Sequence, residues 1–214
     1  MSRSDFFTLS DKGESKIEIK QSVFIGQAVR IYSPEEADAF VKGVKAQYPD
    51  ARHNCYAWIL SNGVNMQKYS DDGEPSGTAG MPLLSVLEKN GLTDCAVAVT
   101  RYFGGILLGK GGLVRAYTEA ASTAVANAGV VKIIEGTEYK MTFGYDAVDK
   151  MTRHVTNKGW EIIGTEYAEN VQMTILCPTY EGEDMIADIV DVSAGKIIPE
   201  KVGTREMACP MDND

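Results

Sequence analysis

Residues 101–115 read RYFGGILLGKGGLVR and hold five glycines within positions 104–112. The apolar run Val97–Thr100 stands just before them and suits a central strand covered on both faces. After them, residues 113–128 repeat apolar side chains at the spacing of one helical face. Glycine tolerates the positive φ angles of a tight connection. The stretch therefore predicts a strand, a glycine-rich loop and a long helix within an α+β domain.

The glycine-rich loop is also a candidate anion-binding site. Its backbone N–H groups are accessible, and the first N–H groups of the following helix lack intrahelical partners. Arg101, Lys110 and Arg115 add positive charge, so a phosphate, a carboxylate or a nucleic-acid backbone would fit. The spacing matches neither a GxxxxGK[ST] phosphate loop nor a dinucleotide fingerprint. The alternative is a turn that serves only tight strand-to-helix packing.

The residues predicted to bind an anion or a nucleic acid are Arg52, Thr78, Arg101, Gly104, Gly105, Gly109, Lys110, Gly111, Gly112 and Arg115.

Upstream, residues 71–80 read DDGEPSGTAG, with three carboxylates in four positions. Carboxylate oxygens bind divalent metal ions, orient arginines or transfer protons. No cofactor is predicted, but a divalent metal is a candidate at Asp71, Asp72 and Glu74. The alternative is that these carboxylates are solvated in a turn or pair with arginines of the neighbouring segments.

His53 is one of two histidines and stands at the start of a predicted strand. An imidazole titrates near pH 6.5 and can act as a general acid or base. A catalytic set would therefore consist of His53, Asp71, Asp72 and Glu74. The alternative is a structural or surface histidine. A nucleophile pair of His53 with Cys55 is disfavoured, because no third group is in view to orient it.

The other elements of the first domain follow from local patterns. Alternation predicts a strand region over residues 16–31, and Ser33 is placed to cap a helix. Residues 55–60 and 66–69 predict two strands joined by a hairpin turn at Asn62-Gly63. A helix between these strand regions is expected to pack on their sheet.

The second domain begins after a predicted linker. Residues 130–134 suit a last strand of the first domain, and residues 135–138 lack apolar side chains, which predicts domains at 1–134 and 135–214. Beyond the linker the order is strand, helix, strand, strand, helix and strand, with the last strand over 196–202. This order is typical of a ferredoxin-like βαββαβ domain.

Composition narrows the function classes. Residues 1–134 hold 14 Lys+Arg and 14 Asp+Glu, whereas residues 135–214 hold 7 and 16, so the net charge of −9 lies in the second domain. This disfavours nucleic-acid binding by that domain and leaves the first domain neutral. The apolar cluster within residues 6–9 is too short for a secretion signal or a membrane span, so a soluble, cytosolic protein is expected. Four well-separated cysteines predict reduced thiols.

Three motifs occur in order: RHNCYAW at 52–58, DDGEPSGTAGMP at 71–82, and the 101–117 segment with RYFGG, LG and GGLVRAY. Together they resemble the YigZ/IMPACT family over residues 15–130, and the βαββαβ pattern resembles the DUF1949 domain that bacterial members append. Lys110 stands where a small residue is expected in that family.

The resemblance implies a fold for each domain. The first would be like the second domain of ribosomal protein S-five and domain four of elongation factor G, a mixed sheet with helices on one face. The second would be like domain five of elongation factor G. Eukaryotic relatives regulate translation by contacting the activator of an amino-acid-sensing initiation-factor kinase. They add a different N-terminal domain, so that partner is not carried over to this chain.

We therefore expect a translation-associated regulatory or accessory factor that binds RNA, the ribosome or a ribosome-associated protein through the first domain. A membrane partner is not expected. One alternative is an enzyme acting on a small phosphorylated or carboxylated ligand, and the other is a protein-interaction module without a ligand. The sequence does not predict an oligomeric state.

Overall fold

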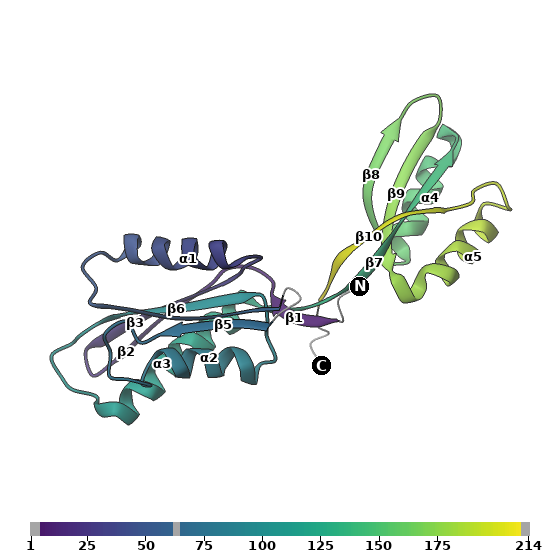
Figure 1. Cartoon of the computed structure of the whole chain (residues 1–214). Helices are drawn as coiled ribbons and strands as arrows, with labels where there is room; N and C mark the ends of the chain where they lie inside the picture. Colours follow the sequence, from purple (N-terminus) through teal and green to yellow (C-terminus); the bar gives the residue numbers. More distant parts are fainter. Residues whose placement is uncertain (1–4, 62–64, 211–214) are drawn as a thin grey trace. The chain divides into compact units, whose positions relative to one another are not determined.

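The computed structural model describes residues 5–61 and 65–210, so the predicted Asn62-Gly63 turn lies outside the described residues. The chain divides into two compact units, built on Phe6–Lys132 and on Ile133–Cys209. We call them the N-terminal and the C-terminal unit (Figure 1). Within the described ranges, no helix is both long enough and apolar enough to cross a membrane.

The N-terminal unit is built on a five-stranded sheet of order β2-β3-β6-β4-β5. Its strands are β2 (Gly13–Ile19), β3 (Ser22–Arg30), β4 (His53–Ser61), β5 (Asn65–Ser70) and β6 (Cys95–Tyr102). Each neighbouring pair is antiparallel, which differs from the mixed sheet implied by the family resemblance. The predicted strand region 16–31 is a hairpin that turns at Lys20 and Gln21, both with positive φ.

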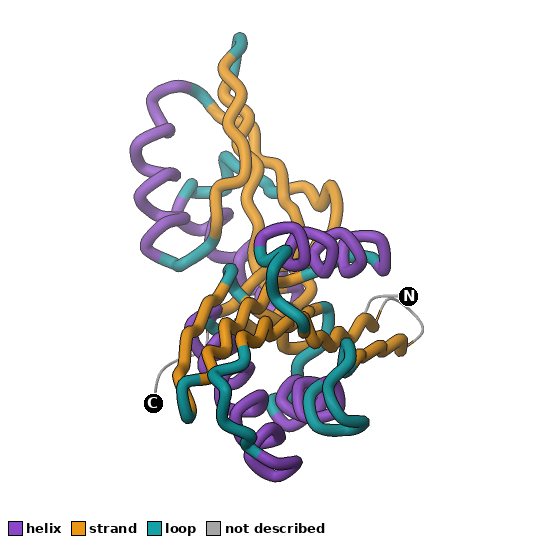
Figure 2. Tube along the Cα trace, turned by 90° about the vertical axis from the view of Figure 1, so that its left-hand side faces the viewer, coloured by secondary structure: helices purple, strands orange, loops and turns teal. Residues whose placement is uncertain are grey.

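Helices cover both faces of this sheet. Helix α1 (Pro34–Gln47) packs mainly on β4 and β6 from one side, while α2 (Gly80–Lys89) and α3 (Gly109–Ala128) cover the other (Figure 1). The turned view in Figure 2 also shows helices on either side of the strands. The α+β class is as predicted, but α1 departs from the implied arrangement with helices on one face only.

The position of α1 follows from the side chains of the central strands. Residues 95–101 of β6 are all buried, so β6 is covered on both faces, as its apolar run predicted. On the α1 side, Trp58 and Ala96 form a small core with Ala37 of the helix. Ser33 caps α1, because its hydroxyl accepts a hydrogen bond from the Glu36 N–H.

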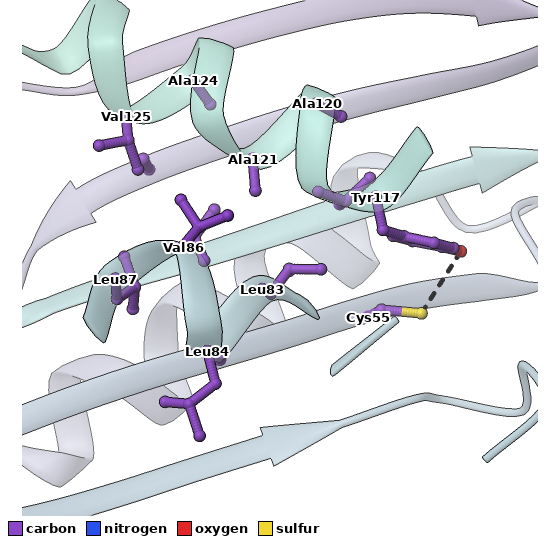
Figure 3. Packing of buried hydrophobic residues seen from close by; sticks show 14 of the residues in the cluster. Cys55, Leu83, Leu84, Val86, Leu87, Tyr117, Ala120, Ala121, Ala124 and Val125 are labelled. Atoms are coloured by element: carbon purple, nitrogen blue, oxygen red, sulfur yellow. Dashed lines mark hydrogen bonds between the residues drawn. The ribbon is translucent and has the colours of Figure 1, made fainter. Parts of the chain in front are cut away.

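On the opposite face, α3 approaches the sheet closely because its inner side is made of small residues. Ala120, Ala121 and Ala124 are completely buried against the sheet and α2 (Figure 3). A Cβ atom on Gly26 of β3 would lie 2.7 Å from the Ala120 carbonyl oxygen, which is too close for any side chain. The same carbonyl accepts a hydrogen bond from the Ser15 hydroxyl at 2.7 Å. Gly26 is therefore required for this packing.

The C-terminal unit has the predicted ferredoxin-like order. Its strands are β7 (Val130–Phe143), β8 (Glu161–Tyr167), β9 (Val171–Pro178) and β10 (Glu200–Pro210). They are connected by η1 (Tyr145–Ala147), α4 (Val148–Asn157), η2 (Thr179–Glu181) and α5 (Gly182–Val192). The strand order is β10-β7-β9-β8, and the β7–β9 and β8–β9 pairs are antiparallel. Strand β1 (Phe6–Leu9), from the short apolar cluster near the start of the chain, belongs to the N-terminal unit.

Two expectations for this part of the chain are corrected. Residues 135–138, expected to form a linker, continue β7, and Thr137 is completely buried. Gly136 and Thr137 pair with Pro178 and Cys177 of β9, and such backbone pairing needs no apolar side chain. The last strand begins at Glu200 and not at residue 196.

The close packing of α3 can be tested by replacing Gly26 with alanine. We expect Gly26→Ala to lower the free energy of unfolding of the N-terminal unit by about 1–3 kcal/mol, because its methyl group would overlap the Ala120 carbonyl. Urea unfolding in a Trp160→Phe background measures this, since Trp58 is then the single tryptophan of the chain.

The matched control is Gly43→Ala in α1. A Cβ there would meet no atom within 4 Å, and alanine favours a helix by about 1 kcal/mol over glycine, so this variant should gain stability. A Gly26→Ala protein as stable as Gly43→Ala would contradict the packing argument.

Candidate functional site

The three sequence motifs meet at one end of the N-terminal sheet, on the face covered by α2 and α3. His53 of β4 is the register partner of Arg101 at the end of β6. The Cys55 thiol lies 3.0 Å from the carbonyl oxygen of Asp71, which begins the acidic loop. The first segment is therefore in direct contact with both of the others.

A chain of buried polar side chains joins the segments. Arg101 Nη1 donates to Glu74 Oε1 at 2.7 Å, and the Tyr117 hydroxyl of α3 donates to the same oxygen at 2.8 Å. Cys55 Sγ lies 3.5 Å from the Tyr117 hydroxyl (Figure 3). Arg101 is only 7% exposed and its guanidinium lies 5.5 Å from the rings of Phe24 and Phe103. These contacts hold the acidic loop, the end of β6 and helix α3 together.

This geometry corrects the role expected for Arg101. Its charge was expected to contact a phosphate, but Glu74 already neutralises it in the interior. Thr78 is also turned inward, because its hydroxyl donates to the Pro75 carbonyl at 2.6 Å and the residue is 2% exposed. We assign both residues a structural role.

Cys55 is not an activated nucleophile in this arrangement. Burial raises the pKa of its thiol well above the ordinary value, and burial likewise raises the pKa of the Tyr117 hydroxyl. Both groups therefore keep their protons at neutral pH. A thiolate is needed for nucleophilic attack, so the geometry agrees with the sequence argument against a His53–Cys55 pair.

Asp71 caps the start of α2. One carboxylate oxygen accepts from the N–H groups of Ala79 and Gly80 at 2.9 Å each, and the other accepts from the Gly77 N–H at 2.9 Å. Burial alone would raise the pKa of this carboxyl, but the hydrogen bonds from Gly77, Gly80, Ala79 and Thr78 outweigh it and lower the pKa. A carboxylate of the protein itself therefore lies at the start of α2.

Asp72 connects the loop to β4 and α1. Its carboxylate accepts from Lys45 Nζ and from the Asn54 N–H, both at 2.7 Å. Its carbonyl oxygen lies 2.9 Å from His53 Nδ1, so this nitrogen carries the ring proton. That contact leaves His53 Nε2 without a hydrogen-bond partner among the described residues. A catalytic role of His53 stays a prediction.

The three carboxylates point to different partners. Asp71 binds backbone N–H groups, Asp72 binds Lys45, and Glu74 binds Arg101. Among residues 5–61 and 65–210, no three His, Cys, Asp or Glu side chains are arranged to hold a metal ion. The arrangement does not favour the divalent metal considered from the sequence.

Three cations of the predicted set have exposed side chains: Arg52, Lys110 and Arg115. In the part of the chain that the structure describes, none of them has a hydrogen bond or ion pair. We call them the cationic set. They can therefore offer their charge to a partner.

The glycine-rich loop leads into an uncapped helix. Among the residues that the structure describes, no side chain caps the start of α3, whose first residues are Gly109, Lys110, Gly111 and Gly112. Gly104 passes so close to the Gln21 backbone that a Cβ atom would lie 2.0 Å from it, and Gly105 has φ +83°. Gly104 thus allows tight packing where the loop begins, and the glycines at the start of α3 leave backbone N–H groups accessible where it ends.

Two features were not predicted from the sequence. Tyr117 was read only as an apolar helix position, although a tyrosine among alanines on a helix face signals a hydroxyl that needs a partner. The loop also exposes apolar side chains: Phe103 is 54% exposed, Ile106 44% and Leu107 82%. Their signal was an apolar run between glycines without helical or strand periodicity.

The buried ion pair can be tested with Arg101→Met. We expect a loss of about 3–5 kcal/mol in the free energy of unfolding, because Glu74 would stay buried without its cation. Arg101→Met combined with Glu74→Gln should lose less than the two single losses together, since the pair is coupled. Urea unfolding measures both. Arg115→Met is the control, and a loss equal to that of Arg101→Met would refute the pairing.

The cap on α2 gives a pH-dependent prediction. The pKa of Asp71 is lower in the folded chain than the ordinary value of 3.8 that it has in the unfolded chain. The ionised carboxylate therefore stabilises the fold fully above pH 3.8, and this stabilisation is lost as the pH falls through the folded-state pKa. Asp71→Ala should therefore cost about 0.5–2 kcal/mol at pH 7 and progressively less below pH 3.8. Urea unfolding at several pH values checks this. A pH-independent difference, or the same loss in Glu119→Ala, would contradict it.

Comparison with known proteins matches both units. Residues 20–125 match the family model of the Impact N-terminal domain, and residues 141–196 match that of DUF1949, a domain of unknown function. The chain is 39% identical over 167 residues to the IMPACT family member YvyE of Bacillus subtilis, covering 78% of this chain and 77% of that protein.

Two further similarities extend over most of the chain. It is 36% identical over 182 residues to the IMPACT family member YigZ of Escherichia coli, covering 84% of this chain and 89% of that protein. A crystal structure of a hypothetical protein has a TM-score of 0.60 at 30% identity and covers 99% of this chain and 100% of that one. The chain belongs to the IMPACT family.

Proposed function

We propose that this protein is a translation-associated regulatory or accessory factor that binds RNA through the N-terminal unit. The observation that carries the proposal is the cationic set: Arg52, Lys110 and Arg115 are exposed and have no partner among the described residues. Phosphate contacts from Lys and Arg dominate the affinity of nucleic-acid-binding proteins. The chain belongs to the IMPACT family, and the eukaryotic relatives in that family regulate translation. This membership supports a role in translation.

The start of α3 adds a second source of affinity. Its free N–H groups carry the positive end of the helix dipole and follow a glycine-rich loop that lets a backbone phosphate approach. The contrast with α2 supports this assignment, because the start of α2 is filled by the Asp71 carboxylate. An anion would find one helix start open and the other closed.

The exposed ring of Phe103 favours a single-stranded RNA over a bare phosphate. Its neighbour Arg101 lies 5.5 Å from the ring, on a side chain that Glu74 holds in place. Exposed aromatic rings of proteins stack on the unpaired bases of a single strand. Phosphate contacts then position the strand, and the ring adds affinity for bases without reading their sequence.

A ribosome-associated protein is the second candidate partner. Ile106 and Leu107, the latter 82% exposed, place apolar surface at the loop. Exposed apolar side chains surrounded by polar groups are a common mark of a protein-binding site. In that case the loop, and not the cationic set, would carry the affinity.

The proposal is tested by binding of a single-stranded RNA to a variant with Arg52, Lys110 and Arg115 replaced by alanine. We expect affinity to fall at least about tenfold at moderate salt and the slope of log K against log salt to decrease by about 2. Fluorescence anisotropy over a salt series measures both quantities.

A triple alanine variant of the exposed lysines Lys16, Lys42 and Lys89 is the matched control, since it removes the same formal charge elsewhere. Equal RNA affinity of the two triple variants would refute RNA binding by the cationic set. Ribosome binding that survives the first triple variant but is lost in Leu107→Asp would replace RNA by a protein partner.

A further inference from the structure

A cavity of about 450 Å³ lies between α1 and the β2–β3 side of the N-terminal sheet. It opens there because α1 packs mainly on β4 and β6, which leaves part of this face uncovered. None of the residues of the candidate functional site lines it. Its volume falls within the range of about 300–1,000 Å³ that is usual for small-molecule sites.

One wall of the cavity is a stripe of α1. Glu36, Phe40, Gly43 and Gln47 recur at three- and four-residue spacing, so they share one side of the helix. A glycine inside a helix costs about 1 kcal/mol relative to alanine. A Cβ on Gly43 would meet no atom within 4 Å, so the protein itself does not require this glycine. Its effect is to widen the cavity.

The other lining groups combine opposite charges with an apolar floor. Glu14 in β2 and Lys12 just before this strand line a second wall, and their side-chain charges have no partner among the described residues. Val29 of β3 contributes to the floor, with Phe40 facing the same space. At one end, Gln27 Nε2 donates to Gln47 Oε1 at 2.9 Å, which leaves the other amide groups able to bind a ligand.

This lining disfavours ligands whose charges all have the same sign. A polyanion such as a nucleotide would meet the carboxylates of Glu14 and Glu36. A simple cation would meet Lys12 and Arg30. A molecule that carries one ammonium, one carboxylate and an apolar side chain avoids both repulsions and uses the floor as well.

We propose that the cavity binds a small zwitterion of the amino-acid type, a free amino acid or a dipeptide with an apolar side chain. The carboxylate pairs with Lys12, the ammonium pairs with Glu14, and the side chain packs on Val29 and Phe40. Gly43 leaves room for the ligand backbone. The site is independent of RNA binding, because it shares no residue with the cationic set.

The test is a titration of the ¹⁵N-labelled full chain, followed by amide NMR shifts. The probes are leucine, phenylalanine and the dipeptides Ala-Leu and Leu-Phe, each also as its N-acetylated and its C-amidated derivative. We expect saturable shifts at Gly43 and Gln27 at millimolar or lower concentration. Each derivative should bind at least about fivefold more weakly, since it lacks one of the two charges.

Two variants locate the site. Gly43→Leu should abolish binding by filling the cavity, and Gly43→Ala should weaken it at least about threefold while the protein becomes more stable. Lys42→Ala, which changes an exposed residue outside the cavity lining, and Arg115→Ala should bind as the natural chain does. Binding retained by Gly43→Leu would overturn the proposal. So would derivatives that bind equally well, or an absence of saturable shifts with every probe.

Discussion

The contact between Glu74 and Arg101 holds the candidate site together. Removing two charges from water costs several kcal/mol per ion, and only a fixed partner offsets that cost. Here a single carboxylate oxygen receives both the guanidinium at 2.7 Å and the Tyr117 hydroxyl at 2.8 Å. The acidic loop, the end of β6 and the first turns of α3 are therefore joined through this one carboxylate oxygen. The exposed groups around them are positioned by this interior contact.

Helices α2 and α3 differ in what lies at their first N–H groups. The start of α2 is closed by Asp71, which supplies the acceptor from within the chain. The start of α3 has no side-chain cap within residues 5–61 and 65–210, and an exposed loop rich in glycine and apolar residues precedes it. Capping usually adds stability, so a long helix without a cap gives up some stability at this end. That pattern suits a surface whose partner comes from outside.

Local patterns in the sequence were sufficient for much of the architecture. The strand, loop and helix around residues 101–115, the Ser33 cap and the order of elements in the C-terminal unit all depend on side chains close together in the chain. The antiparallel sheet and the placement of α1 did not follow in this way. Both depend on the pairing register of β4 with β6, which decides which side chains lie on the same face of the sheet. Pairing between strands that are distant in the sequence leaves no local pattern.

The chemistry of the site was predictable only in part. The sequence identified the segments that meet, but a charged residue looks the same whether it is buried in an ion pair or exposed. Arg101 and Arg115 both flank the glycine-rich loop, yet only Arg115 is exposed. The difference comes from Glu74, which lies 27 residues before Arg101 and reaches it only in the folded chain.

The strand order of the N-terminal unit also has a consequence during synthesis of the chain. Strand β6 lies at the centre of the sheet but is made last of its five strands. The β2–β3 and β4–β5 hairpins must therefore wait with unpaired inner edges until β6 emerges and inserts between them. Such open edges are prone to wrong pairing. Strand β5 ends at Ser70 and β6 spans Cys95–Tyr102, so both inner edges stay unpaired while residues 71–94 and then β6 itself are made.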